Sequence, residues 1–211
     1  MRSEPLVSAI MPTRARAVFA VAALECWLAQ TYPHRELVIV DDADAPSFPT
    51  APNEPGVSYH RLPARLTIGA KRNIACSRAA GEIVCHWDDD DWSAPERIAD
   101  QVARLVESAK QMTGYHSMVF RSEQGSRWQY RSPNADYAIG TSLMYWRSFW
   151  LQHAFPALES GEDTSLWMAA LRQKQVVACD AAGMMIATIH GGNTSPRQLG
   201  SRNYQEIPAC A

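Results

Sequence analysis

Residues 83–97 read IVCHWDDDDWSAPER, a short apolar run that ends in four consecutive aspartates. Signals for the start of a helix follow the acids directly. Ser93 and Glu96 have the spacing of a capping box, and Pro95 suits a first helical turn. We therefore expect residues 88–91 to lie on a tight connection between a buried strand and a helix.

Four carboxylates on one short connection repel one another. Two unit charges about 4 Å apart interact by roughly 4 kcal/mol at an effective dielectric constant near 20. Solvent exposure, raised pKa values or a bound cation relieves such repulsion. Oxygen ligands favour a hard cation such as Mg2+, Mn2+ or Ca2+. A divalent-cation site and a solvated acidic turn are the two interpretations of the acids taken alone.

The rest of the first half alternates apolar runs with helical spacing. Strands are predicted at residues 6–11 (stopped by Pro12), 37–42, 57–61 and 82–87, and helices at 15–30, at 68–80 (closed by Gly81) and after Pro95. The continuous apolar run at 37–40 is typical of a strand covered on both faces, as in a parallel sheet. Strand–helix alternation predicts right-handed βαβ units and the α/β class.

Three of the predicted strands end in polar residues. The first is followed by Pro12 and Thr13, the second ends at Asp41 and Asp42, and the fourth leads to residues 88–91. In open α/β sheets, ligands bind along the edge formed by the C-terminal ends of the strands. We therefore expect these three motifs to converge on one cleft.

The second half predicts a small mixed or antiparallel β extension. Segments at 113–121, 127–131 and 139–146 read as β structure, a helix follows residues 160–164, and short strands are predicted at 176–179 and 184–189. The tail from Ser195 has no periodicity and is expected to be loop or partly disordered. We expect one domain over residues 1–211, with a nucleotide-binding half at about 1–110, an acceptor-side half at about 111–193 and a tail at 194–211.

Composition excludes several classes of partner. The chain has 211 residues, 46% of them hydrophobic, and a net charge of −2 with scattered basic residues, so no nucleic-acid partner is expected. Its five cysteines form no CxxC pair, which favours a reducing compartment over a zinc site or a disulfide framework. No leader and no transmembrane segment is predicted. We expect a cytoplasmic protein, with a peripheral position at the inner face of the membrane as a further option.

Five motifs, in order along the chain, together resemble those of glycosyltransferase family 2. The residues that carry the resemblance are 7–13, 30–42, 69–73 with 80–83, the acids at 88–92, which look like the DXD motif of the family, and 161–163, which look like its acceptor-side ED motif. The resemblance spans about residues 5–193. It implies the GT-A fold, with a mostly parallel central sheet flanked by helices.

The resemblance also implies an activity. Such enzymes move a sugar from a nucleotide-sugar donor, here with UDP-sugar favoured, to a hydroxyl of a glycan, glycolipid or small-molecule acceptor, with Mn2+ or Mg2+ as cofactor. By correspondence of motif, Asp90 is the direct metal ligand, and Asp88 reaches the metal through water or binds the ribose. His190 is a candidate third ligand. Asp89 lies near the donor sugar, and Asp91 is a supporting or capping acid.

Further residues are assigned to the donor by the same correspondence. Asp42 matches the position that accepts the ring N–H of uracil, and Thr13 and the Pro12 backbone line the same base site. Arg72 is expected to contact the base or a phosphate, with a helix-surface arginine as the alternative. Lys71 is expected to face solvent.

The ED motif implies the chemical step. Asp163 matches the general base that takes the proton of the attacking hydroxyl in inverting enzymes, a role worth about 100- to 10,000-fold in rate. Glu162 is expected to orient the acceptor or its loop. The structural alternative is a pair of acids that stabilises a helix N-terminus. GT-A folds support retaining as well as inverting transfer, so the inverting mechanism is the favoured one of two.

Other functions fit the residues less well. A sugar-1-phosphate nucleotidyltransferase needs a glycine-rich basic loop after its first strand, and residues 12–16 contain no glycine. A hydrolase with paired carboxylates suits four adjacent acids poorly. A non-catalytic nucleotide- or sugar-binding module with the same fold is opposed by the presence of Asp88, Asp90 and Asp163.

Overall fold

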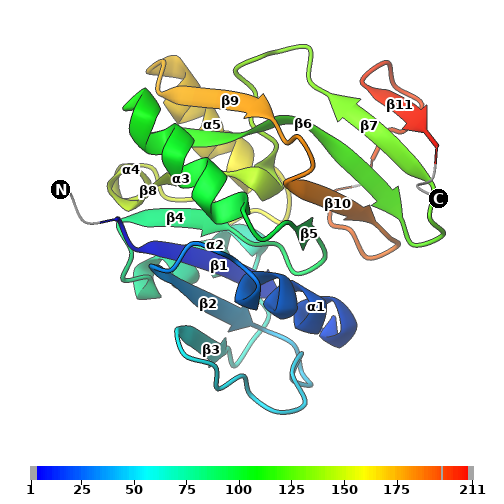
Figure 1. Cartoon of the computed structure of the whole chain (residues 1–211). Coiled ribbons are helices and arrows are strands. Elements are labelled where there is room, and N and C mark those ends of the chain that lie inside the picture. The colour runs from blue at the N-terminus through cyan, green and yellow to red at the C-terminus, as the bar shows by residue number, and fades with distance from the viewer. Residues whose placement is uncertain (1–3, 196, 209–211) are drawn as a thin grey trace.

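The computed structural model describes residues 4–195 and 197–208, and it forms an α/β structure around one eleven-stranded sheet (Figure 1). The first half contains β1 (Val7–Thr13), α1 (Ala17–Leu28), β2 (Arg35–Asp41), β3 (Val57–Arg61), α2 (Ile68–Arg78), β4 (Ile83–His86), β5 (Trp92–Ser93) and α3 (Arg97–Ser108). The second half contains β6 (Met112–Ser122), β7 (Arg127–Arg131), the 3-10 helix η1 (Gly140–Ser142), β8 (Met144–Trp146), α4 (Arg147–Gln152), α5 (Glu162–Arg172), β9 (Val176–Asp180), β10 (Met185–Ile189) and β11 (Tyr204–Ile207).

The first half of the sheet is parallel, as predicted. The main strand order is β11-β7-β6-β8-β4-β1-β2-β3, in which β1 pairs in parallel with both β2 and β4, and β2 pairs in parallel with β3. The register places Thr13 beside Asp41. The C-terminal ends of β1, β2 and β4 therefore share one edge, where the acids follow.

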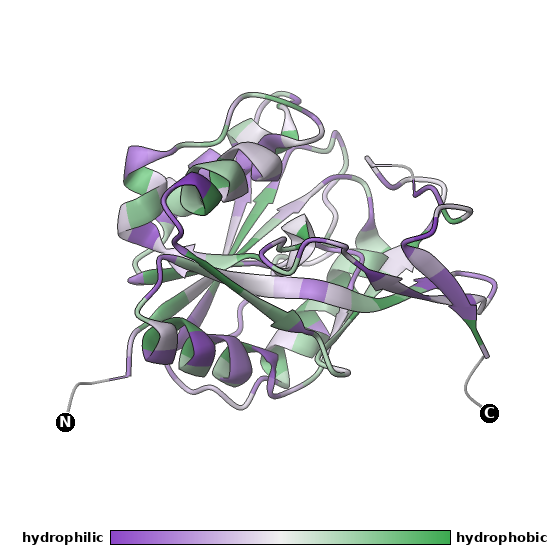
Figure 2. Cartoon of the chain, turned by 90° about the horizontal axis from the view of Figure 1, so that it is seen from above, coloured by the Kyte–Doolittle hydropathy of each residue, from purple (hydrophilic) through white to green (hydrophobic). Residues whose placement is uncertain are grey.

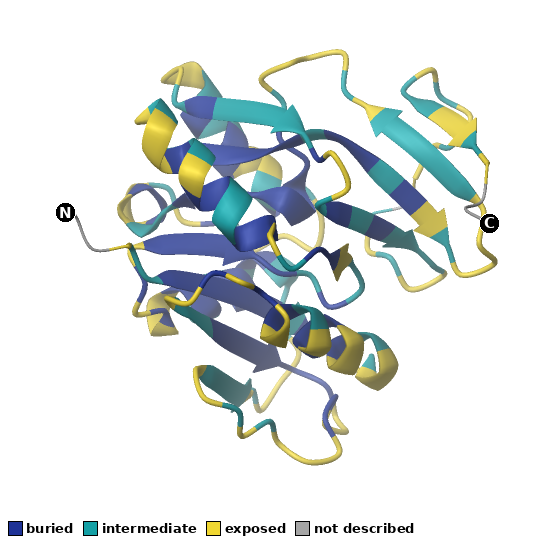
Figure 3. Cartoon of the chain, viewed as in Figure 1, coloured by how far each residue is buried: buried dark blue, intermediate teal, exposed yellow. Residues whose placement is uncertain are grey.

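Helices cover both faces of this parallel core. Ala9 and Met11 of β1 pack in one buried cluster with residues of α1 and α3, whereas Ile10 packs in another with residues of α2, α4 and α5. The layers are visible from above in Figure 2, and Figure 3 shows the central strands as the most buried elements. This alternation explains why the strands read as continuous apolar runs.

The second half forms the predicted mixed extension. The long strand β6 pairs antiparallel with β7 and β8 and parallel with β9 and β10. The strand β5 was not predicted, and η1 lies at the start of the segment 139–146 that was expected to be β structure. Neither α4 nor β11, which pairs antiparallel with β7, was predicted either. The tail thus contains a strand, so the expectation of loop or disorder was wrong there, because β7 supplies a partner that the local sequence does not announce.

The end of β1 differs from the prediction. Pro12 does not stop β1, which runs on to Thr13. Beyond Ile10, β1 pairs with β2 alone and not with β4, so the missing N–H of proline leaves no ladder bond broken on that side.

Two helix boundaries also differ. α3 begins at Arg97, and within the described part of the chain the Glu96 side chain makes no capping bond, so the predicted capping box was wrong. Ser93 instead lies in β5 and accepts a hydrogen bond from Arg97 Nη1 (2.9 Å). Gly81 does not close α2, which ends at Arg78. A Cβ on Gly81 would lie 2.5 Å from Ser8 Oγ, so close approach of the backbone explains this glycine.

None of the described helices combines the length and the apolar character that a bilayer-crossing segment requires.

Candidate active site

Two of the three strand-end motifs meet in one cleft of about 250 Å3. Its lining includes Pro12, the four aspartates at 88–91, Arg72, Glu162 and Asp163. Thr13 Oγ1 donates to Asp89 Oδ2 at 2.6 Å, which joins the end of β1 to the acids that follow β4. Asp41 and Asp42 are buried behind this edge and do not line the cleft, so the structure brings together only the first and third of the predicted motifs. We call residues 88–91 the acidic corner.

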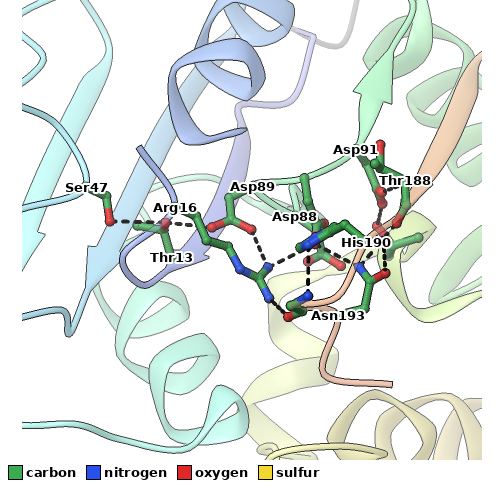
Figure 4. A network of polar contacts seen from close by, with 12 residues as sticks. Thr13, Arg16, Ser47, Asp88, Asp89, Asp91, Thr188, His190 and Asn193 are labelled. Atoms are coloured by element: carbon green, nitrogen blue, oxygen red, sulfur yellow. Dashed lines mark hydrogen bonds and ion pairs between the residues drawn. The ribbon is translucent and has the colours of Figure 1, made fainter. Parts of the chain in front are cut away.

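Each acid of the corner has its own set of partners (Figure 4). Asp89 is 3% exposed and accepts from Thr13 and from Arg16 Nη1 (3.0 Å). Asp91 accepts from the backbone N–H of Thr188 (2.9 Å) and from the hydroxyl of Thr141. Asp91 is thus bonded to β10 and η1, and it does not cap α3.

Burial and mutual repulsion disfavour the charged forms of two of these acids. Burial raises the pKa of Asp89 to about 6, with a contribution from the charge of Asp90, although Arg16 and Thr13 act in the opposite sense. Burial, together with the charges of Asp90 and Asp88, raises the pKa of Asp91 well above its usual range. Raised pKa values are one of the ways in which crowded carboxylates are tolerated.

Asp88 and Glu162 share one buried cation. The Arg72 guanidinium is 5% exposed and donates through Nη2 to Asp88 (2.9 Å) and through Nε to Glu162 (3.0 Å). Burial opposes ionisation of Asp88, but the charges of Arg72 and His86 and the hydrogen bonds from Arg72 and Thr141 together outweigh it and lower the pKa of Asp88 to about 2. The alternative of a helix-surface arginine is therefore wrong. Arg72 ties the acidic corner to the start of α5.

Asp90 lies at the junction of three segments. Its Oδ2 accepts hydrogen bonds from Arg16 Nη1 (2.9 Å), His190 Nε2 (2.9 Å) and Asn193 Nδ2 (3.2 Å). The His190 ring also stacks on Phe19, with ring centroids 4.5 Å apart. The structure thus brings two of the three predicted metal ligands, Asp90 and His190, into direct contact.

The donor set suits a hard cation, but its geometry is not that of a ready-made site. Carboxylate oxygens and an imidazole are ligands that Mn2+ accepts. Within residues 4–195 and 197–208, no three His, Cys, Asp or Glu side chains are arranged to hold a metal ion. The guanidinium of Arg16 lies among these acids and contacts both Asp89 and Asp90.

Asp163 lies at the start of α5 and lines the same cleft as the acidic corner. Its Oδ1 accepts from the Thr164 backbone N–H (2.6 Å), while Oδ2 lies against the Cα of Gly140, where any Cβ would collide with it. Gly161, in the left-handed region at φ 80°, is the residue before α5. The carboxylate is therefore placed by a helix start and by the absence of a side chain on η1.

The predicted base site is occupied by protein contacts. Asp42 has a fully buried side chain and accepts from Lys71 Nζ (2.9 Å) and from the Leu66 backbone N–H (2.8 Å). Lys71 also donates to the Thr13 carbonyl (3.2 Å), and its side chain is 6% exposed. The expectation that Lys71 faces solvent was wrong, because the acid that pairs with it lies 29 residues away in sequence.

Some residues of the site were not predicted: Arg16, Asn193, Gly140 and Thr141. Arg16 could have been found, because it follows the first strand on the same edge as Thr13. The other three carry no local signal. Gly140 and Thr141 reach the acidic corner only because β8 pairs antiparallel with β4.

Comparison of the sequence with known proteins gives one family. The family model described as Glycosyl transferase family 2 matches residues 8–173. The chain is 31% identical over 128 residues to WcaA of Escherichia coli (strain K12). The name of that protein assigns it as a glycosyl transferase of colanic acid biosynthesis. That match covers 58% of this chain and 44% of WcaA, so the chain spans less than half the length of this relative.

Comparison of the structure identifies the fold. TarS of S. aureus (residues 1–349, in complex with UDP-GlcNAc) aligns with a TM-score of 0.71 at 19% identity, covering 90% of this chain and 60% of that one. The mannosyltransferase PcManGT from Pyrobaculum calidifontis, in complex with GDP-Man and Mn2+, aligns with a TM-score of 0.69 at 18% identity, covering 93% and 59%. The predicted GT-A fold is thereby confirmed.

Proposed function

The chain belongs to glycosyl transferase family 2, and from that premise we propose that it transfers a sugar from a nucleotide-sugar donor to an acceptor hydroxyl. The observation that carries the proposal is the meeting of the acidic corner and Asp163 in one cleft. Sugar transfer needs both groups of residues, because the acceptor hydroxyl attacks the anomeric carbon from one direction and the diphosphate leaves it in another. The relative WcaA suggests an acceptor of the cell-envelope glycan class.

The nucleotide is proposed to lie at the end of β1. A second hollow of about 420 Å3 is lined by Thr13, Lys71 and Arg65 among others. Lys71 and Asp42 place an N–H donor beside a carboxylate. Because Asp42 is fully buried and also accepts from the Leu66 N–H, uracil would present its adjacent carbonyl and ring N–H to this pair only after displacing that N–H. UDP-sugar is favoured as the donor because Asp42 matches the uracil-reading position of the family. Guanine has the same adjacent groups, whereas cytosine lacks the ring N–H.

Arg72 is proposed to contact the donor diphosphate. Its Nη1 is buried and has no hydrogen-bond partner among the described residues, and Arg72 lines the cleft. An unpaired buried donor costs about 1–3 kcal/mol, and a phosphate oxygen would satisfy it. Because Arg72 also holds Asp88 and Glu162, donor binding would be coupled to the position of both acids.

A divalent cation, Mn2+ or Mg2+, would be held by Asp90, with Asp88 and His190 as further ligands. When bound, it would act as a Lewis acid on the departing diphosphate.

Asp163 is proposed as the general base of an inverting reaction. As the acceptor oxygen forms its bond to the anomeric carbon, its proton passes to Asp163, and the bond from that carbon to the phosphate oxygen breaks. Asp163 lines the same cleft as the acidic corner. Glu162 is held by Arg72 and would orient the acceptor-side loop and not take the proton itself.

A panel of UDP-, GDP- and CDP-sugars, with Mn2+ or with a chelator, tests the proposal. We expect metal-dependent turnover of one donor, and loss of metal-dependent nucleotide binding in Asp90→Asn. The matched control is Asp136→Asn, an exposed aspartate outside the cleft. Nucleotide binding without turnover for every donor and acceptor offered would favour a binding module. Retained metal-dependent binding in Asp90→Asn would remove Asp90 as the metal ligand.

A further inference from the structure

Arg16 contacts two of the four aspartates of the acidic corner, Asp89 and Asp90. It is the residue before the first turn of α1 and belongs to none of the acidic motifs. Its Nη1 lies 3.0 Å from Asp89 Oδ1 and 2.9 Å from Asp90 Oδ2, and its Nη2 donates to the Gly192 carbonyl. One guanidinium therefore bridges two acids of the corner and the turn that follows β10.

These ion pairs are shielded from water. The side chains of Arg16, Asp89 and Asp90 are 24%, 3% and 11% exposed. Burial alone would lower the pKa of Arg16, yet the neighbouring carboxylates of Asp89 and Asp90 raise it. A partly buried pair is screened less by salt than a surface pair, so Arg16 offsets the charges of Asp89 and Asp90, as Arg72 offsets that of Asp88.

The position of Arg16 conflicts with metal ligation by Asp90. Asp90 Oδ2 already accepts from Arg16, His190 and Asn193. An ion that binds this oxygen must displace at least one of these donors. Only Arg16 among them carries a fixed positive charge, which an incoming divalent cation would repel.

His190 would also have to give up a contact for a metal ion to bind at Asp90. The Gly192 backbone N–H donates to His190 Nδ1 (3.1 Å), so Nε2 carries the proton that reaches Asp90. A metal ion at Nε2 would have to take the place of this hydrogen bond to Asp90. Arg16 holds the Gly192 carbonyl of the same turn. Release of Arg16 would thus loosen the turn that fixes the His190 ring.

From these contacts we infer that Arg16 is a built-in counter-cation that competes with the divalent ion for Asp90. The inference rests on the metal site of the proposed function. Without metal, Arg16 holds Asp89, Asp90 and the 190–193 turn together. With metal, Arg16 leaves Asp90, and its guanidinium becomes available to an anionic group in the cleft.

Direct measurement of Mn2+ binding tests this competition. Free Mn2+ is quantified by electron paramagnetic resonance during titration of wild type and Arg16→Gln, each with and without UDP, and of Arg14→Gln without UDP. Arg14→Gln is the matched control for the titrations without UDP, because it removes the same charge from the same loop and Arg14 makes no ion pair with the corner among the described residues. It is not compared in the presence of UDP, since Arg14 lines the hollow proposed for the nucleotide. We expect Arg16→Gln to bind Mn2+ about tenfold more tightly, the order of one charged hydrogen bond, and Arg14→Gln to bind it as wild type does.

Three outcomes would overturn the inference. Unchanged or weaker Mn2+ binding by Arg16→Gln would show that Arg16 does not compete. An equal gain in Arg14→Gln would show a general effect of charge and not a contact. No Mn2+ binding by any variant, with or without UDP, would remove the metal site of the proposed function together with this inference, whereas the first two results leave that site intact.

A measurement on the wild-type protein covers the case in which Arg16→Gln does not fold. The 15N resonances of the Arg16 guanidinium are followed during titration with Mg2+ in the presence of UDP. Slow rotation, which reports a held ion pair, should be lost as Mg2+ saturates the protein. Unaltered Arg16 resonances at saturation would overturn the inference.

Discussion

The carboxylates of Asp88, Asp89 and Asp90 accept hydrogen bonds from residues distant in sequence, whereas Asp163 is bonded by its neighbour Thr164. The acidic corner is therefore held by tertiary structure, and Asp163 by the start of one helix. It follows that changes at the corner should alter stability and ligand binding. Changes around Asp163 should alter rate while the fold is kept.

The largest effect is expected on the α5 side. Asp163→Asn should lower turnover by about 100- to 10,000-fold, because the amide cannot take the proton of the acceptor. Nucleotide affinity should stay near the wild-type value, as measured by calorimetry with UDP and Mn2+. The control is Asp136→Asn. If nucleotide affinity fell in parallel with turnover, Asp163 would have a structural role, like the acids of the acidic corner, and not that of a general base.

The next largest effect is expected from Arg72→Gln, which should lower the stability of the folded protein. It removes the buried partner of Asp88 and Glu162, so the free energy of unfolding should fall by about 3–5 kcal/mol. Urea denaturation measures this change. Arg78→Gln, an exposed arginine at the end of the same helix, should change it by less than about 0.5 kcal/mol. Equal effects of the two substitutions would contradict the role given to Arg72.

Gly140→Ala should displace Asp163 without changing any titratable group. The added Cβ would collide with the Asp163 carboxylate, and a misplacement of about 1 Å can cost about 100-fold in rate. Gly200→Ala is the control, because a Cβ there meets nothing within 4 Å and its φ is ordinary. Full activity of Gly140→Ala in steady-state kinetics would show that the position of Asp163 does not limit the reaction.

The smallest effect concerns pH. The pKa of Asp89 is about 6 against an ordinary value of 3.8, so the folded protein holds this proton more tightly than the unfolded chain. Its ionisation therefore lowers stability as pH rises from about 4 to about 6. Asp89→Asn should gain about 1–3 kcal/mol relative to wild type over that window, measured as urea unfolding at pH 4 and pH 7. If Asp89→Asn changed the free energy of unfolding by the same amount at pH 4 and at pH 7, the raised pKa given to Asp89 would be contradicted.

The sequence predicted the features that depend on local pattern. Apolar runs located β1, β2, β3 and β4 to within a few residues, and the acids after them pointed to the shared edge. The family resemblance and the GT-A fold were confirmed. The roles of the individual site residues stay predictions, although the structure brings Asp88, Asp90, His190, Glu162 and Asp163 to one region of the molecule.

The features that sequence did not predict all depend on distant partners. Ser93 pairs with Met185 in the β5–β10 ladder and so does not cap α3. Lys71 is buried because it forms an ion pair with Asp42. Arg16 belongs to the site because it forms an ion pair with Asp90, which lies 74 residues away in sequence. In each case a long-range ion pair or strand pairing overrides a local tendency.

The chain between β7 and η1 starts and finishes at fixed points. β7 ends at Arg131, which pairs with Ser117 of β6. η1 begins at Gly140, and the strand that follows it, β8, pairs antiparallel with β4. Lengthening a surface loop between fixed ends costs little, since the entropy of closure grows only with the logarithm of its length. That loop ends at Tyr137 and Ile139, which line the cleft. Segments of different length and chemistry could therefore be exchanged at residues 132–136 to reshape the part of the cleft that Tyr137 and Ile139 line, while the acidic corner stays as it is.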